Sequence, residues 1–171
     1  MRLKIGMNRA QREAYCGVRE TVFQHILNLL APLLLLAAIL TIVLRWNTLP
    51  QRIPTTYDFS GNITGYGSRG TLLLMPVIGL AVDLTIGLCW RFPKSWNMGR
   101  RVTPRNAPFL YHATCNMVAE LRLCLALYFS IFALLECFAP EKAPSLLAWG
   151  WMLSVFPLIP YLIRLARIRR L

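Results

Sequence analysis

Four long apolar segments constrain this chain more than any other feature of its sequence. They lie at about residues 26–44, 71–90, 117–138 and 146–163. Each has close to the ~20 residues that an α-helix needs to cross the hydrocarbon core of a bilayer. A helix bonds all of its backbone polar groups within the segment, whereas a single extended strand in lipid cannot. The sequence therefore predicts an all-α membrane protein with four transmembrane helices.

The composition agrees with contact with a lipid bilayer. Apolar residues make up 56% of the 171 residues and charged residues only 15%, whereas soluble domains carry about 25% charged residues. The net charge of +12 would indicate nucleic-acid binding on a polar chain, but on this apolar chain it indicates basic flanks beside membrane spans. We therefore expect no nucleic-acid partner, and the composition argues against a soluble enzyme.

The basic residues are distributed unevenly around the four segments. Five precede the first segment, five lie between the second and third, and four end the chain, whereas the opposite side has four in all. Because cytoplasmic loops carry an excess of Lys and Arg, both termini are predicted to be cytoplasmic. We expect a basic tail over residues 1–25 and a single membrane domain over 26–171. Its predicted helices span about 26–45, 70–90, 106–138 and 145–164, with an ordered outer loop over 46–69.

The predicted outer loop has a patterned sequence. Pro50 and Pro54 restrict the backbone toward extended geometry, and the following T-T-Y run suits a short strand. Asp58 begins a group of turn-forming residues. Two interpretations stay open: a cap that seals the helix ends, and a cap that also contacts a ligand or partner. The candidate binding residues of the loop are Leu49, Pro50, Ile53, Pro54, Tyr57, Asp58, Gly61, Gly65, Tyr66, Gly67 and Ser68.

The loop motif L-P-x-x-I-P-T-x-Y, followed by S-G and by G-Y-G-S with a basic residue, resembles a known family signature. It is similar to the domain of unknown function numbered sixteen forty-eight, the N-terminal part of SdpI-type bacterial membrane proteins. The resemblance covers 49–75 and extends more loosely through the second helix and over 103–117. Thr56 stands where family members usually carry His, so a metal-binding or titrating role of that His is not expected here.

The resemblance implies a small multi-pass protein of the bacterial cytoplasmic (inner) membrane. Better-studied SdpI-type relatives are generally longer, confer immunity to a secreted toxin and take part in signalling to a transcriptional repressor. SdpI-like immunity or envelope signalling is therefore what the resemblance implies for the outer loop. It does not identify the toxin or peptide.

Ionisable residues within the spans are costly and need partners. Asp83 lies seven residues before the end of the second segment, and Arg122 five residues after the start of the third. At ~1.5 Å per residue, the two lie at similar depths, so we predict an Asp83–Arg122 pair. Glu120 cannot share the face of Arg122 and is expected to meet Asn116 or reach water. Glu136 is expected to reach water near the outer end.

No catalytic motif is present in the sequence, and the five cysteines and two histidines have no metal-site spacing. We expect no enzyme activity, metal or cofactor. The leading hypothesis is recognition of a ligand, a secreted peptide or a membrane protein by the outer loop. The alternative is a transporter or channel subunit in which Asp83 and Arg122 line a polar path in an oligomer. A structural accessory subunit is a third interpretation, and homo-oligomerisation stays open.

Overall fold

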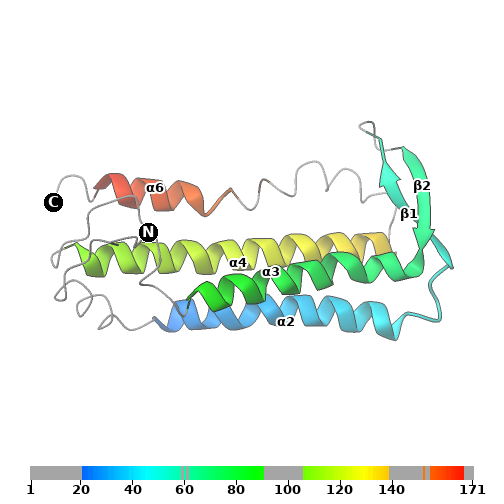
Figure 1. Cartoon of the computed structure of the whole chain (residues 1–171), viewed down its shortest axis with the longest axis horizontal. Coiled ribbons are helices and arrows are strands. Elements are labelled where there is room, and N and C mark those ends of the chain that lie inside the picture. Colours follow the sequence, from blue (N-terminus) through cyan, green and yellow to red (C-terminus); the bar gives the residue numbers. More distant parts are fainter. Residues whose placement is uncertain are drawn as a thin grey trace, which may run out of the picture.

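Three long helices form a bundle, and a β-hairpin stands across one end of it (Figure 1). The computed structural model describes residues 21–58, 60, 62–90, 106–138, 152 and 155–167. Its elements are α2 (Val22–Leu44), β1 (Arg52–Tyr57), β2 (Ile63–Ser68), the 3₁₀ helix η1 (Arg69–Leu73), α3 (Leu74–Trp90), α4 (Ala107–Phe138) and α6 (Leu158–Arg167). Helices α2 and α4 run in the same direction and α3 runs back between their ends (Figure 1).

Three of these helices are long and apolar enough to cross a membrane. The candidate spans are Val22–Leu44, Arg69–Cys89 and Pro108–Phe138, of 23, 21 and 31 residues. The prediction of a mostly helical membrane protein is therefore confirmed for the first three spans. The fourth predicted segment is described at residue 152 and from residue 155 onward, whereas most of the basic tail and the connection before α4 lie outside the described residues. Its described part includes most of α6, a helix of 10 residues beside α4 that continues past the end of the predicted segment.

Helix α2 begins with a capping box four residues before the predicted boundary. The Thr21 hydroxyl accepts a hydrogen bond from the Gln24 amide at 3.3 Å, and the Gln24 side chain accepts one from the Thr21 amide at 2.9 Å. This reciprocal pairing satisfies two N–H groups at the helix start. Along the helix, the buried residues follow one another at spacings of three or four, so a single stripe faces the bundle. They are Gln24, Leu27, Ala31, Leu35, Ala38 and Ile42.

Small residues let the helices approach closely in the middle of the bundle. Ala31 and Leu35 of α2 pack against Ala126 of α4. A Cβ atom on Gly79 of α3 would lie 2.8 Å from a Leu35 methyl carbon and 2.9 Å from the Cβ of Phe129. Membrane helices associate through such close packing because apolar side chains gain little hydrophobic free energy by moving from lipid to a helix interface. Gly79 therefore sets how close α3 lies to its neighbours.

The stretch predicted as a loop forms an antiparallel hairpin. Arg52 is opposite Ser68 at its base and Tyr57 is opposite Ile63 near its turn, with irregular register around Thr56. The Asp58 carboxylate accepts hydrogen bonds from the backbone amide of Ser60 at 2.9 Å and from that of Asn62 at 2.7 Å. The turn chemistry expected of Asp58 is thus present, and strand structure extends over more of the loop than the T-T-Y run suggested.

Candidate functional site

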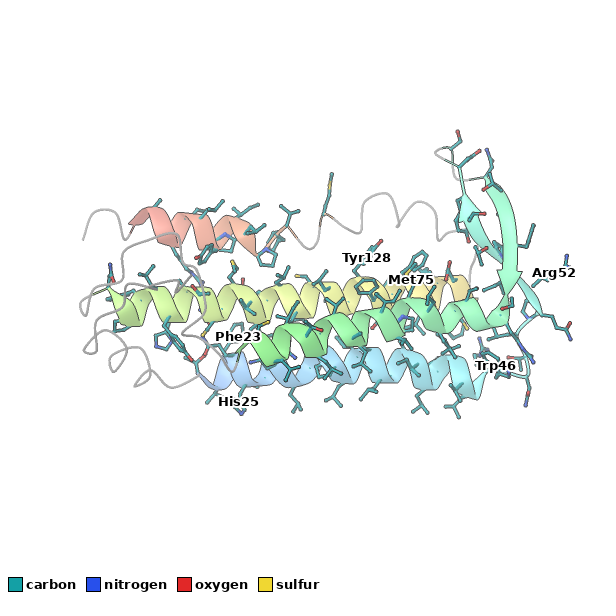
Figure 2. All side chains as sticks on the ribbon, in the orientation of Figure 1. Phe23, His25, Trp46, Arg52, Met75 and Tyr128 are labelled. Atoms are coloured by element: carbon teal, nitrogen blue, oxygen red, sulfur yellow. The ribbon has the colours of Figure 1, made fainter. Side chains whose placement is uncertain are left out.

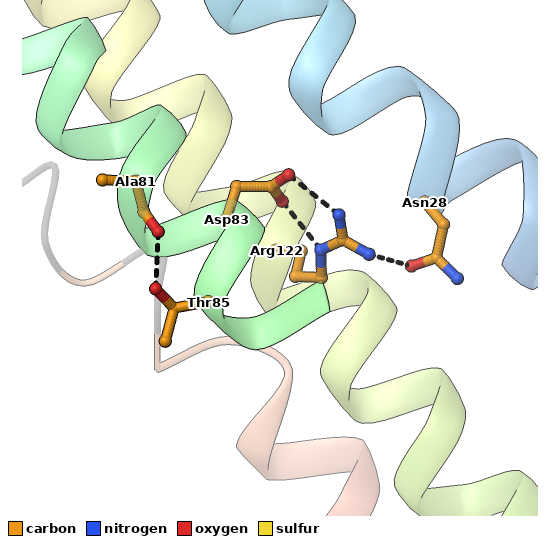
Figure 3. Close-up of polar contacts among 5 residues, drawn as sticks. All are labelled: Asn28, Ala81, Asp83, Thr85 and Arg122. Carbon is orange, nitrogen blue, oxygen red and sulfur yellow. Dashed lines mark hydrogen bonds and ion pairs between the residues drawn. The ribbon is translucent and has the colours of Figure 1, made fainter. Parts of the chain in front are cut away.

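A buried polar network connects the three long helices (Figure 3). It consists of Asn28 of α2, Asp83 of α3 and Arg122 of α4. The Arg122 Nε donates to Asp83 Oδ1 at 2.7 Å and its Nη2 donates to Asp83 Oδ2 at 2.8 Å. The Arg122 Nη1 donates to Asn28 Oδ1 at 2.8 Å. The contact between Asp83 and Arg122 expected from their depths is therefore present, as a two-bond fork.

The surroundings of the guanidinium explain how a charge pair is accommodated there. The Asp83 and Arg122 side chains are 3% and 8% exposed, so water does not screen them. Gly87 lies one turn after Asp83 on α3, and a Cβ atom there would be 3.4 Å from Arg122 Nη2. The guanidinium thus lies against this turn of α3, at ordinary contact distance from where a Cβ atom of residue 87 would be. The cost of removing two charges from water is offset only when the ion pair has good geometry and its other donors and acceptors are also hydrogen-bonded.

A second polar contact joins α2 and α4 nearer the start of α2. The Gln24 side-chain amide donates to Asn116 Oδ1 at 2.8 Å. Asn116 was one of the two environments expected for Glu120, and in the structure it bonds Gln24. Glu120 itself is half-buried on α4. Sequence reasoning missed Gln24 and Asn28 as partners; the available signal was an amide side chain at or inside an apolar segment.

Glu136 differs from the expectation that it would reach water. Its side chain is only 8% exposed near the end of α4, because the hairpin and η1 lie over this end of the bundle. Tyr57 of β1 interacts electrostatically with this carboxylate. Burial raises the pKa of the Tyr57 phenol, and the negative charge of Glu136 raises it further. Tyr57 is therefore a protonated phenol at neutral pH.

The base of the hairpin is anchored in an apolar cluster at the helix ends. Ile53 of β1 is 3% exposed and packs with Ile42 of α2, Leu72 of η1 and Ala133 of α4. Trp46, Leu49 and Leu73 pack around these four residues. We call β1, β2 and η1 together the hairpin cap. Because all three long helices or their extensions contribute to the cluster, the cap is held as part of the bundle.

Strand β2 of the hairpin cap presents side chains to its surroundings. Tyr66 is 64% exposed and Ile63 is 39% exposed, both on β2. A Cβ atom on Gly67 would lie 2.7 Å from a Thr55 methyl carbon, and one on Gly65 would collide with the Thr56 hydroxyl. These two glycines therefore let β2 lie against β1.

The residues predicted for the loop site thus divide between anchoring and exposure. Leu49, Ile53, Pro54 and Tyr57 are buried or half-buried, and Asp58 organises the turn. Pro50, Tyr66 and Ser68 are exposed, and Gly61 lies outside the described residues. Within the described part of the chain, no three His, Cys, Asp or Glu side chains are arranged to hold a metal ion. The exposed members of this set provide a surface for contact with a ligand or partner.

Comparison with known proteins gives one result for this region. No curated protein and no solved structure matches the chain. One segment of the chain matches a family of proteins. It runs from the second half of α2 through the hairpin cap into the first half of α3, and it contains neither Asp83 nor Arg122. Residues 33–80 match the family described as Domain of unknown function (DUF1648), which confirms the resemblance that the loop motif indicated.

Proposed function

We propose that this protein is a non-enzymatic membrane protein that recognises a peptide or a partner protein through its hairpin cap. The observation that carries the proposal is the contrast between the two sides of the hairpin. Ile53 is buried in the cluster at the helix ends, whereas Tyr66 on the other strand is mostly exposed. The bundle thereby holds a defined surface in place.

A surface held in place in this way suits recognition. Binding to a flexible loop requires ordering its backbone and side chains, which reduces affinity, whereas a preorganised surface avoids much of that cost. Tyr66 adds a large amphipathic ring with few rotatable bonds, a residue type enriched at binding hot spots. The matched family segment also contains the hairpin cap and leaves out the buried charge pair.

The concrete form of this function follows from the resemblance to SdpI-type proteins. We propose immunity to a secreted peptide, or envelope signalling, in the bacterial cytoplasmic membrane. In this proposal both termini lie in the cytoplasm, and the hairpin cap lies on the outer side of the membrane. It is supported by the uneven distribution of basic residues around the apolar segments.

The transporter alternative finds its support in the charges of Asp83 and Arg122. Both oxygens of the Asp83 carboxylate accept from the guanidinium, and the third Arg122 nitrogen donates to Asn28. Such saturation favours a role in holding the helices together. Asp83→Asn/Arg122→Gln separates the alternatives, because it removes both charges and leaves no guanidinium buried without its counter-charge. Transport through this site would be abolished, whereas recognition by the hairpin cap would persist in the folded protein.

Site-specific photo-crosslinking tests the proposal. A photo-reactive residue replaces exposed Tyr66 in full-length protein in native membranes, and a second protein carries it at exposed Arg164 of α6 as a control. We expect a defined adduct from position 66 that is absent from position 164. The adduct should disappear in a Gly65→Val background, because any side chain there collides with Thr56. Folded protein that yields the same adducts at both positions, or none, would contradict recognition by the hairpin cap.

A further inference from the structure

Two arginines at the hairpin end of the bundle lie over aromatic rings. The Arg45 guanidinium carbon is 4.3 Å from the centroid of the Phe138 ring, and that of Arg69 is 4.8 Å from the centroid of the Trp46 ring. We call Arg45 and Arg69 the stacked arginines. Arg45 directly precedes Trp46, and Arg69 Nη1 donates to the Trp46 carbonyl at 3.1 Å, so both arginines belong to the same end of the bundle.

The stacked arginines lie where the apolar helix surfaces end. Leu44 of α2 is 76% exposed, Leu74 of α3 is 54% exposed and Phe138 of α4 is 55% exposed. Exposed apolar side chains at these helix ends belong in lipid, and the ring of Trp46 suits the headgroup layer. Arg45 follows Leu44 directly, and η1, which begins with Arg69, leads into Leu74. The two guanidinium groups thus come at the level where lipid phosphates begin. Figure 2 shows Trp46 at this end, beside the hairpin, with Phe23 and His25 at the opposite end of α2.

The local charges leave this position cationic. Among the described residues at this end of the bundle, the acids are Asp58, engaged in the hairpin turn, and Glu136, buried under the hairpin cap. The N–H groups of a guanidinium point outward in its own plane, and of these the Arg69 Nη1 group donates to the Trp46 carbonyl. Planar N–H groups of this kind match the oxygens of a phosphate.

We propose that the stacked arginines bind the phosphates of anionic phospholipid headgroups in the leaflet at the hairpin end. A lipid is the occupant that the geometry favours, because the guanidinium groups adjoin the apolar surface that acyl chains would cover. The bound lipid would anchor the ends of α2 and α4 and the start of η1 to one leaflet. This inference does not depend on recognition of a partner by the hairpin cap.

Lipid titration followed by native mass spectrometry tests the inference. Full-length protein in a neutral detergent is titrated with phosphatidylglycerol and, separately, with phosphatidylcholine. We expect tighter binding of phosphatidylglycerol, and a loss of about fivefold in affinity for each stacked arginine removed, in Arg45→Gln and then in Arg45→Gln/Arg69→Gln. Arg45→Gln alone is sufficient if the double variant does not fold, because Arg45 is exposed at the C-cap of α2.

A matched control removes the same charge from other positions. Arg52 and Arg164 are both exposed, so Arg52→Gln/Arg164→Gln lowers the net charge equally without touching the stacked arginines. We expect this variant to bind phosphatidylglycerol as the unmodified protein does. Equal losses in the two double variants would show diffuse charge attraction and overturn the proposal. Displacement of the lipid by millimolar inorganic phosphate would assign the site to free anions and would also overturn it.

Discussion

The polar network and the hairpin cap hold the same three helices together by different interactions. In the network, one guanidinium forms directional bonds to Asp83 and Asn28. Under the hairpin cap, Ile42, Ile53, Leu72 and Ala133 bury apolar surface with no directional bond. The network specifies which helix faces meet, since a rotated helix would leave a charge unpaired. The apolar cluster tolerates small rearrangements and mainly determines whether the hairpin stays docked.

The difference follows from the surroundings of each region. Within the hydrocarbon core, apolar side chains gain little by leaving lipid for the protein interior, so polar bonds and close packing carry helix association. The hairpin extends beyond the ends of the apolar spans, where burial of Ile53 removes apolar surface from water. The same chain therefore uses charge pairing where water is absent and apolar burial where water is available.

Breaking the ion pair should have the largest effect. Asp83→Asn leaves the Arg122 guanidinium buried without its counter-charge, and should lower the free energy of unfolding by about 3–5 kcal/mol. Measurement is by circular dichroism during titration of detergent-solubilised protein with a denaturing detergent. Thr85→Ala changes an exposed residue of the same helix (Figure 3) and should cost less than about 0.5 kcal/mol.

The double variant distinguishes a coupled pair from two independent polar residues. Asp83→Asn/Arg122→Gln removes both charges, so it should cost clearly less than the sum of the two single changes. If the loss of unfolding free energy in the double variant equals the sum of the losses in the two single variants, the coupling that the geometry indicates is contradicted.

Ile53→Ala should release the hairpin while leaving the helices packed. Truncating a buried Ile typically costs about 2–5 kcal/mol, and here the loss should fall mainly on docking of the hairpin cap. Hydrogen exchange should accelerate over 52–68 and stay slow in α2 and α4. Ile63→Ala, at an exposed position of the same hairpin, serves as the control. Acceleration throughout the helices would show that the cap and bundle unfold as one unit.

Gly79→Ala should produce a smaller loss in the middle of the bundle. The added methyl group would meet Leu35 and Phe129 at under 3 Å, and overpacking of this kind costs about 1–3 kcal/mol. Gly70→Ala is the matched control, since its Cβ atom would meet the Ser68 hydroxyl at an ordinary 3.5 Å. The free energies of unfolding of the two variants, measured as above, should differ by this amount; equal values would contradict close packing at Gly79.

Alkaline titration should give the smallest effect. Because burial, together with the Glu136 charge, raises the pKa of Tyr57 above 10.0, the folded protein holds the phenol proton more tightly than the unfolded chain does. The stabilising contribution is full below pH 10 and declines as the pH rises through the folded pKa. Absorbance at about 295 nm, as the difference between the protein and Tyr57→Phe, should show a transition above pH 10. A transition at or below pH 10 would contradict the burial of Tyr57.

Much of the fold and part of the site could be predicted from local patterns. Apolar length predicted four helices, of which three are candidate spans among the described residues, and the residues around Asp58 predicted a turn. The pair of Asp83 and Arg122 could also be predicted, because charges in apolar helices need partners and the rise per residue places both at similar depths. These features depend on length, composition and spacing along one element.

Other features depend on how elements pack against one another, and only the tertiary structure decided them. Asn28 joins the network because of the rotation of α2 about its axis, which the almost uniformly apolar sequence of that helix leaves undetermined. Glu136 is buried because the hairpin folds back over the end of α4, an arrangement that no local pattern encodes. Sequence by itself determined which segments become helices and which residues need partners. Tertiary packing decided which partners they meet, because burial depends on segments distant in the chain.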